Sequence, residues 1–325
     1  MSSIPAPLVP RQSGVTIRPV REEDLPVADR IMRLAFGTFL GMPDPSAFMG
    51  DADYARTRWL ADPSAVFGAE LAGELVGTNF ATRWGTVGFF GPLTIRPDLW
   101  DRGIAQLLLA PTMDLFDRWH IRHAGLFTFA SSAKHVSLYQ KYGFWPRFLT
   151  ALMEIQVPAK PGPAEWTSFS ELSPGEKRTC VQACRELTSS IYEGLDVERE
   201  IRAVDNQHLG DTVLIWNGND LAGLAVCHVG PGTEAGTGKC YVKFGAVRSG
   251  PKATADFRQL LAACGKFAAS RGAAKVIAGM NLSRLEAYRE MLRAGFRTTT
   301  QGVAMQRNSE PGYHRPDVFL IDDWR

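Results

Sequence analysis

The sequence lacks the features that mark membrane-spanning, disordered and disulfide-linked proteins. Its 325 residues contain no uncharged apolar run near the roughly 20 residues that a membrane-spanning helix needs. Hydrophobic residues make up 45% and charged residues 22%, so the low hydrophobicity and high net charge of disordered chains are missing. The 5 cysteines are an odd number at irregular spacing, which predicts reduced thiols in a cytoplasmic protein.

An excess of one charge sign is also missing. Lys and Arg total 36 and Asp and Glu total 34, which gives a net charge of +2. Proteins that bind nucleic acid carry a basic patch or stripe, so the composition gives no case for a nucleic-acid partner, just as hydropathy gives none for a membrane. The 6 histidines are scattered and form no metal-ligand spacing with the cysteines, so we expect no metal.

The length and one proline-rich segment divide the chain. At about 150 residues per domain, two domains are expected. Residues 157–163 contain three prolines and one glycine, which disfavour both a helix and a central strand. We therefore predict a flexible leader at residues 1–14, a first domain at 15–157, a linker at 158–165 and a second domain at 166–325. The leader has no apolar core and does not resemble a secretory signal.

The two halves are predicted to share one order of elements. In the first half, periodicity predicts helices up to residue 36 and at 103–121 and 134–142, and strands at 15–19, 65–71, 74–84, 86–95, 124–130 and 148–157. Pro111 is expected to kink the second helix or end its first part. In the second half, helices are predicted at 174–192, 254–270 and 284–293, and strands at 212–216, 221–229, 239–247, 275–280, 298–306 and 318–322. Residues 230–238 are expected to form a flexible hairpin loop. The repeated order predicts a mixed α/β fold with two similar domains in tandem.

One turn in the first half suggests a phosphate site. A strand ending at residues 93–95 leads through a turn containing Gly103 into a helix. Unpaired N–H groups and a partial positive charge make a helix N-terminus an anion site. Glycine lets the backbone approach the anion closely, and the small Ala105 leaves room beside it. An ordinary strand-to-helix turn with a capping glycine would contain the same residues, so this stretch by itself leaves both interpretations open.

A second motif follows at residues 132–144, and the pair resembles the GNAT superfamily of acyl-CoA-dependent N-acyltransferases. The family's pyrophosphate motif, R/Q-x-x-G-x-G/A after a V-x-P strand end, is similar to this sequence at Ile95, Pro97, Gly103 and Ala105, with Trp100 in place of the Arg or Gln. Its second motif, N-x-x-A-x-x-L-Y-x-x-x-G-F, is matched at Leu138, Tyr139, Gly143 and Phe144, with Ser132 and His135 in place of the Asn and Ala.

The resemblance implies a GNAT-like mixed sheet flanked by helices, acyl-CoA (most simply acetyl-CoA) as co-substrate, and a small-molecule or peptide amine as acceptor. Tyr139 would be catalytic and assist the departing thiolate, although a packed tyrosine without a role is the alternative. The residues it implies for cofactor binding are Leu93, Thr94, Ile95, Asp101, Arg102, Gly103, Ile104, Ala105 and Ser132.

A general base is not evident. The strand at residues 87–90 contains no carboxylate, so a water relay or an amine that arrives neutral is expected. The loop after the first helix carries Asp44, Asp51 and Asp53, where the family places acceptor contacts. Ordinary solvated loop acids are the interpretation that we favour for these three.

The second half resembles the same fold with a degraded cofactor site. Ala255 and Phe257 align with Gly103 and Ala105, and Met291 aligns with Tyr139 as core filler. We therefore expect one acyl-CoA site per chain, with the second half walling the acceptor cleft or forming a homodimer contact. The alternative function is an acyl-CoA-binding sensor or interaction protein with little turnover, which the unusual Trp100 and Ser132 and the missing base keep open.

Overall fold

The computed structural model describes residues 14–157 and 164–325, so most of the predicted leader and linker lies outside the described residues. The first half contains β1 (Val15–Pro19), α1 (Leu25–Phe39), α2 (Tyr54–Ala61), β2 (Val66–Leu71), β3 (Glu74–Trp84), β4 (Val87–Phe90), β5 (Thr94–Ile95), α3 (Ile104–Arg118), β6 (His123–Thr128), α4 (Ala133–Gln140) and β7 (Phe144–Gln156). The second half contains β8 (Thr167–Ser168), α5 (Pro174–Ile191), α6 (Glu198–Gln207), β9 (Gly210–Asn217), β10 (Asp220–Gly230), β11 (Gly236–Val247), α7 (Ala253–Ser270), β12 (Lys275–Asn281), α8 (Leu285–Ala294), β13 (Arg297–Arg307) and β14 (Leu320–Ile321). The predicted mixed α/β class is confirmed.

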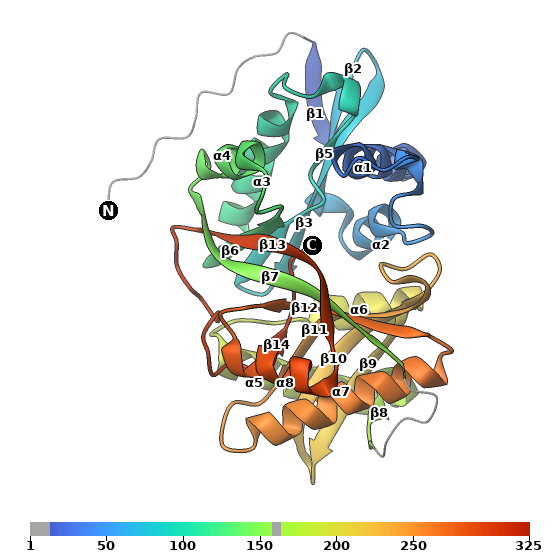
Figure 1. Cartoon of the computed structure of the whole chain (residues 1–325), viewed down its shortest axis with the longest axis vertical. Coiled ribbons are helices and arrows are strands. Elements are labelled where there is room, and N and C mark those ends of the chain that lie inside the picture. Colours follow the sequence, from blue (N-terminus) through green and yellow to red (C-terminus); the bar gives the residue numbers. More distant parts are fainter. Residues whose placement is uncertain (1–13, 158–163) are drawn as a thin grey trace.

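One continuous mixed sheet runs through both halves, because the halves exchange a strand at its centre (Figure 1). The order there is β4-β6-β13-β7-β12-β11. Strand β13 pairs antiparallel with β6, where Val303 faces Thr128, and β7 pairs antiparallel with β12, where Ala151 faces Met280. The order is symmetric about the β13–β7 pair, since β6 and β12 occupy equivalent places and so do β7 and β13. Each half therefore completes its sheet with a strand of the other.

Three local expectations are wrong. Pro111 lies inside α3, so the expected end of the helix at this residue is wrong; the buried face of the helix, which includes Leu108 and Phe116, stabilises it despite the lost hydrogen bond. The sequence indicated no helix at α2 or α6, which contact one another between the halves. The strand expected at residues 86–95 is interrupted into β4 and β5. Both parts pair with β3, and β4 pairs with β6 as well.

The segment expected to be a flexible hairpin loop, residues 230–238, is instead packed against the first half. Thr233 and Glu234 are buried in it. The backbone N–H of Asp53 donates to the carbonyl of Thr233 at 2.9 Å, and the N–H of Thr237 donates to a carboxylate oxygen of Asp51 at 2.8 Å. The turn between β10 and β11 is therefore a contact between the halves.

The second half uses its counterparts of the cofactor residues as core. Phe257 and Met291 are fully buried in one hydrophobic cluster with Leu260, Phe267 and Phe296. Ala255 is exposed on the opposite side of α7. This packing agrees with the interpretation of Met291 as core filler. Within residues 14–157 and 164–325, no helix is both long and apolar enough to cross a membrane.

Candidate active site

The sheet opens at the end of β4. Parallel pairing of β4 with β6 runs from Val87, opposite His123, to Phe89, opposite Gly125, and then stops. Strand β5 pairs with β3 on its other side, where Ile95 faces Gly77. Among the described residues, the edge of β5 toward β6 therefore has no strand partner. The carbonyl of Ile95 accepts from the indole Nε1 of Trp100, and the other backbone groups on this edge are available to an extended ligand that lies along it as an added strand.

The N-terminus of α3, which follows the turn after β5, has no side chain that caps its first backbone N–H groups. Gly103 is the N-cap of α3 and has φ +76°, a conformation that glycine adopts without strain. A Cβ atom at this position would have no atom within 4 Å, so the space in front of the helix is open. Trp100 is part of the turn itself, because its indole Nε1 donates to the carbonyl of Ile95 at 2.8 Å. The open amides and the helix dipole suit an anion here.

A cavity of about 690 Å³ lies between this turn, α1 and α4. Most of the predicted site residues line it together: Leu93, Thr94, Ile95, Asp101, Arg102, Gly103, Ile104, Ala105 and Tyr139. Ser132 does not line it; its hydroxyl oxygen accepts from the N–H of His135 at 3.4 Å and caps α4. A salt bridge of 2.5 Å from Lys134 to Asp101 joins α4 to the turn.

Tyr139 is placed on α4 by packing. Its side chain is buried, and its ring centre lies 5.7 Å from that of Phe90 at the end of β4. Burial raises the pKa of the Tyr139 phenol, so the hydroxyl keeps its proton at neutral pH. The next turn of the chain is tied to α3, since the hydroxyl of Tyr142 donates to the carbonyl of Gln106 at 2.8 Å. Tyr139 can therefore donate a hydrogen bond or a proton into the cavity.

The three loop acids do not line the cavity; two of them make local contacts and the third contacts the second half. Asp44 accepts from the N–H of Ser46, Asp53 accepts from the N–H of Arg56 at the start of α2, and Asp51 accepts from Thr237. The same loop and the first residue of α2 present Phe48, Met49 and Tyr54 to the cavity instead.

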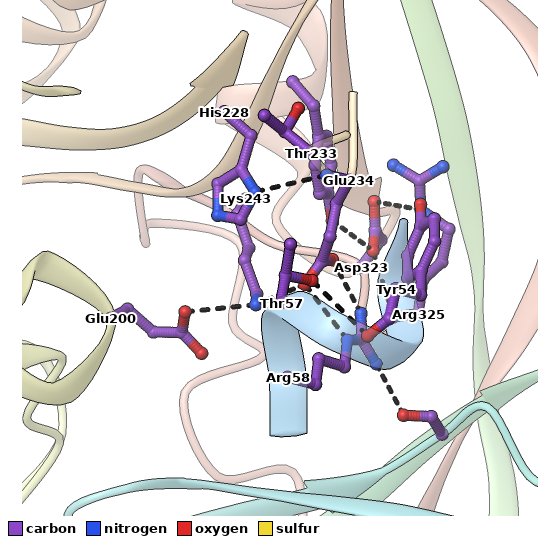
Figure 2. A network of polar contacts seen from close by, with 12 residues as sticks. Tyr54, Thr57, Arg58, Glu200, His228, Thr233, Glu234, Lys243, Asp323 and Arg325 are labelled. Carbon is purple, nitrogen blue, oxygen red and sulfur yellow. Dashed lines mark hydrogen bonds and ion pairs between the residues drawn. The ribbon is translucent and has the colours of Figure 1, made fainter. Parts of the chain in front are cut away.

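A buried chain of charges connects the second half to the segment between β4 and β5, which lines the cavity (Figure 2). The guanidinium of Arg58 makes two bonds to Glu234, at 2.8 and 3.1 Å, and donates to the carbonyl of Gly91 at 2.5 Å. Lys243 Nζ lies 2.7 Å from Glu234 and 3.0 Å from Glu200. Burial alone would raise the pKa of Glu234, but Arg58 and Lys243 hold it well below its usual range.

Sequence reasoning missed this chain of charges. Arg58 and Glu234 are 176 positions apart, and neither belongs to a motif. The end of the described chain was missed too, since Trp324 and Arg325 line the cavity. Arg58 lies on α2, and no periodic pattern in the sequence indicated that helix.

The residues around this cavity match a known protein family in sequence. Residues 30–144, from α1 to the start of β7, match the family model described as the acetyltransferase (GNAT) family. This part of the chain is therefore similar to a GNAT acetyltransferase domain. The matched residues include the β5 edge, the Gly103 turn and Tyr139. No curated protein matches the chain in sequence.

Solved structures share the fold over nearly the whole chain. A candidate acetyltransferase from Pyrococcus horikoshii has a TM-score of 0.69 at 16% identity, with 96% of this chain and 95% of that chain covered. A GCN5-related N-acetyltransferase from Sphaerobacter thermophilus has a TM-score of 0.60 at 17% identity, with 92% and 96% covered. One from Anabaena variabilis ATCC 29413 has a TM-score of 0.51 at 15% identity, with 91% and 73% covered. The fold of both halves together is thus shared with these structures.

Proposed function

We propose that this protein transfers an acyl group, acetyl in the simplest case, from acyl-CoA to a primary amine. The observation that carries the proposal is that the unpaired β5 edge, the Gly103 turn and Tyr139 all line one cavity. The match of residues 30–144 to the GNAT family supports it, and so do the names of the structures with the same fold.

Each part of the cavity has a task in this reaction. The amides of residues 102–105 would bind the diphosphate of the cofactor, with the positive end of the α3 dipole behind them. The edge at Leu93 to Ile95 would pair with the pantetheine amides and hold the thioester at the place where β4 and β6 separate. Holding the thioester and the amine together removes much of the entropic barrier to their reaction.

The chemical step balances with groups that the cavity offers. The amine nitrogen attacks the thioester carbonyl, the carbon–sulfur bond then breaks, and the thiolate takes the proton of the Tyr139 hydroxyl. The nitrogen gives up its extra proton to water, and Tyr139 is reprotonated from solvent. Among the described residues, Asp101 has the one side-chain carboxylate that lines the cavity, and it is paired with Lys134 at the turn. The amine therefore enters neutral or is deprotonated through water.

Two measurements test the proposal in sequence. Calorimetry with acetyl-CoA should show binding at one site per chain. Release of free thiol from acetyl-CoA should then depend on an added primary amine. Binding without thiol release for any amine would favour the sensor function, and no binding of any acyl-CoA would refute both functions.

A further inference from the structure

The part of the cavity beyond the cofactor turn is walled by apolar and aromatic side chains. They come from α1, from the loop that follows it and from the end of the described chain: Met32, Phe36, Phe39, Phe48, Met49 and Trp324. We call this part the apolar chamber. It reaches the surface at the last turn of α1, where Phe39 is 37% and Leu40 is 48% exposed. A molecule that does not arrive on CoA can enter there.

Among the described residues, no acidic side chain lies in the chamber to neutralise a second ammonium group. Asp44 and Asp53 form local bonds outside it, and Asp51 accepts from Thr237 of the second half. Arg325 also lines the cavity, and its guanidinium is already occupied, since Nε donates to Asp323 at 3.0 Å and the group lies over the ring of Tyr241. Burying an unpaired charge is costly, so a second ammonium here would lose its hydration without gaining a partner.

The acids behind the chamber wall are already paired. Glu234 is held by Arg58 and Lys243, and Asp323 by Arg325. Figure 2 shows these residues as one network with Tyr54 beside it. A polycationic ligand would have to break one of these pairs to obtain a carboxylate.

One polar group in the chamber has no partner. Tyr54 lines the cavity with 4% of its surface exposed, and its hydroxyl makes no hydrogen bond to any residue that the structure describes. Burial raises the pKa of this hydroxyl to about 12, so it is a neutral donor and acceptor at physiological pH. An unpartnered buried hydroxyl costs free energy that a ligand with one matching polar atom would recover.

We infer that the acceptor is a monoamine carried on an apolar body, aromatic or aliphatic, and not a polyamine or a polycationic sugar. The inference rests on the proposed function, whose acceptor it specifies. The apolar body would fill the space between α1 and Trp324 and lie against Phe48, while the amine points toward the thioester. Tyr54 would bind one polar atom of the acceptor.

The test compares two amines of similar length, hexylamine and 1,5-diaminopentane, at one pH. Calorimetry on the CoA-loaded protein measures the binding of each, and thiol release from acetyl-CoA measures turnover. We expect hexylamine to bind more tightly than the diamine and to have a kcat/KM at least about tenfold higher. The reason is that an apolar pocket favours a methyl end over a charged ammonium end. Equal or better use of the diamine would overturn the inference while leaving acyl transfer intact.

A variant tests the chamber directly. Phe36→Glu should place a carboxylate in it, shift the preference toward the diamine by about tenfold or more, and leave acetyl-CoA affinity nearly unchanged. Phe48→Glu serves as a second variant if the first does not fold. Leu292→Glu is the control, since Leu292 is exposed on α8. Failure of a folded chamber variant to shift the preference would overturn the inference.

Binding also separates this inference from the proposed function. If no amine releases thiol, tighter binding of hexylamine than of the diamine still supports the chamber preference. If octanoyl-CoA binds far more tightly than acetyl-CoA and excludes hexylamine, the chamber holds the acyl chain and the inference is wrong.

Discussion

Arg58 and Glu234 form a two-bonded ion pair, at 2.8 and 3.1 Å, that joins the two halves of the chain. Their side chains are 4% and 0% exposed. The same guanidinium donates to the carbonyl of Gly91, three residues before β5 begins. The second half therefore braces the strand along which the cofactor would lie, although its own counterparts of Gly103 and Ala105 are not built for the cofactor.

Glu234→Gln should lower the free energy of unfolding by about 3 kcal/mol, because it leaves the charge of Arg58 buried and uncompensated. Urea unfolding measures the loss. The matched control is Glu286→Gln, which removes an exposed partner of Arg289 and should cost less than about 1 kcal/mol. Equal losses of unfolding free energy in the two variants would show that the buried pair does not stabilise the contact between the halves.

The stability of the protein should fall as the pH decreases from about 6.5 toward 4. Burial lowers the pKa of His123 and of His228 to about 4, so both are neutral in the folded chain and protonate more readily when it unfolds. Each should contribute a slope of about 1.4 kcal/mol per pH unit in this window, with the full stability present above it.

His228→Gln should reduce this slope by about 1.4 kcal/mol per pH unit, measured from urea midpoints at pH 7, 6 and 5. His208→Asn is the control, since His208 is exposed at the end of α6 in a left-handed conformation that asparagine tolerates. If the slope is unchanged in His228→Gln, His228 does not bind more protons in the unfolded chain than in the folded chain, and the prediction is wrong.

Gly103→Phe should abolish acyl-CoA binding, because its side chain would enter the open space before α3 and deny the diphosphate its amides. Losing two or three charge-assisted hydrogen bonds, each worth about 1.5–3 kcal/mol, weakens binding by at least about a hundredfold. The control Ala255→Phe changes the exposed equivalent position on α7 and should bind normally. Two equivalent sites per chain, or normal binding by Gly103→Phe, would contradict the assignment of the site to the first half.

Tyr139→Phe should keep acyl-CoA affinity and lower kcat by about 10²-fold or more, since it removes a proton donor and little packing. Steady-state thiol release measures kcat, and calorimetry measures the affinity. Tyr288→Phe is the control, because Tyr288 packs against the core of the second half. A kcat equal to that of the control variant would leave Tyr139 with a packing role only.

The sequence by itself determined the features that depend on short stretches of chain. The hairpin predicted at residues 65–84 is β2 and β3, which strand patterns and the turn at Ala72 and Gly73 specify locally. The turn before α3 and the helix that carries Tyr139 were predicted from motifs a dozen residues long. All the predicted cofactor residues except Ser132 line one cavity, since a strand, a glycine turn and a helix N-terminus form together.

Only the tertiary structure decided how the halves combine. The pairing of β13 with β6 joins residues about 175 positions apart, and it is made by backbone hydrogen bonds, which are the same for any sequence. The bond between Arg58 and Glu234 is equally invisible in the sequence. Charged residues are normally exposed, and these are stable in the interior only because the folded halves bring each beside its partner. The apolar chamber has the same origin, since its walls come from α1, the loop after it and Trp324, which meet only when the sheet is complete.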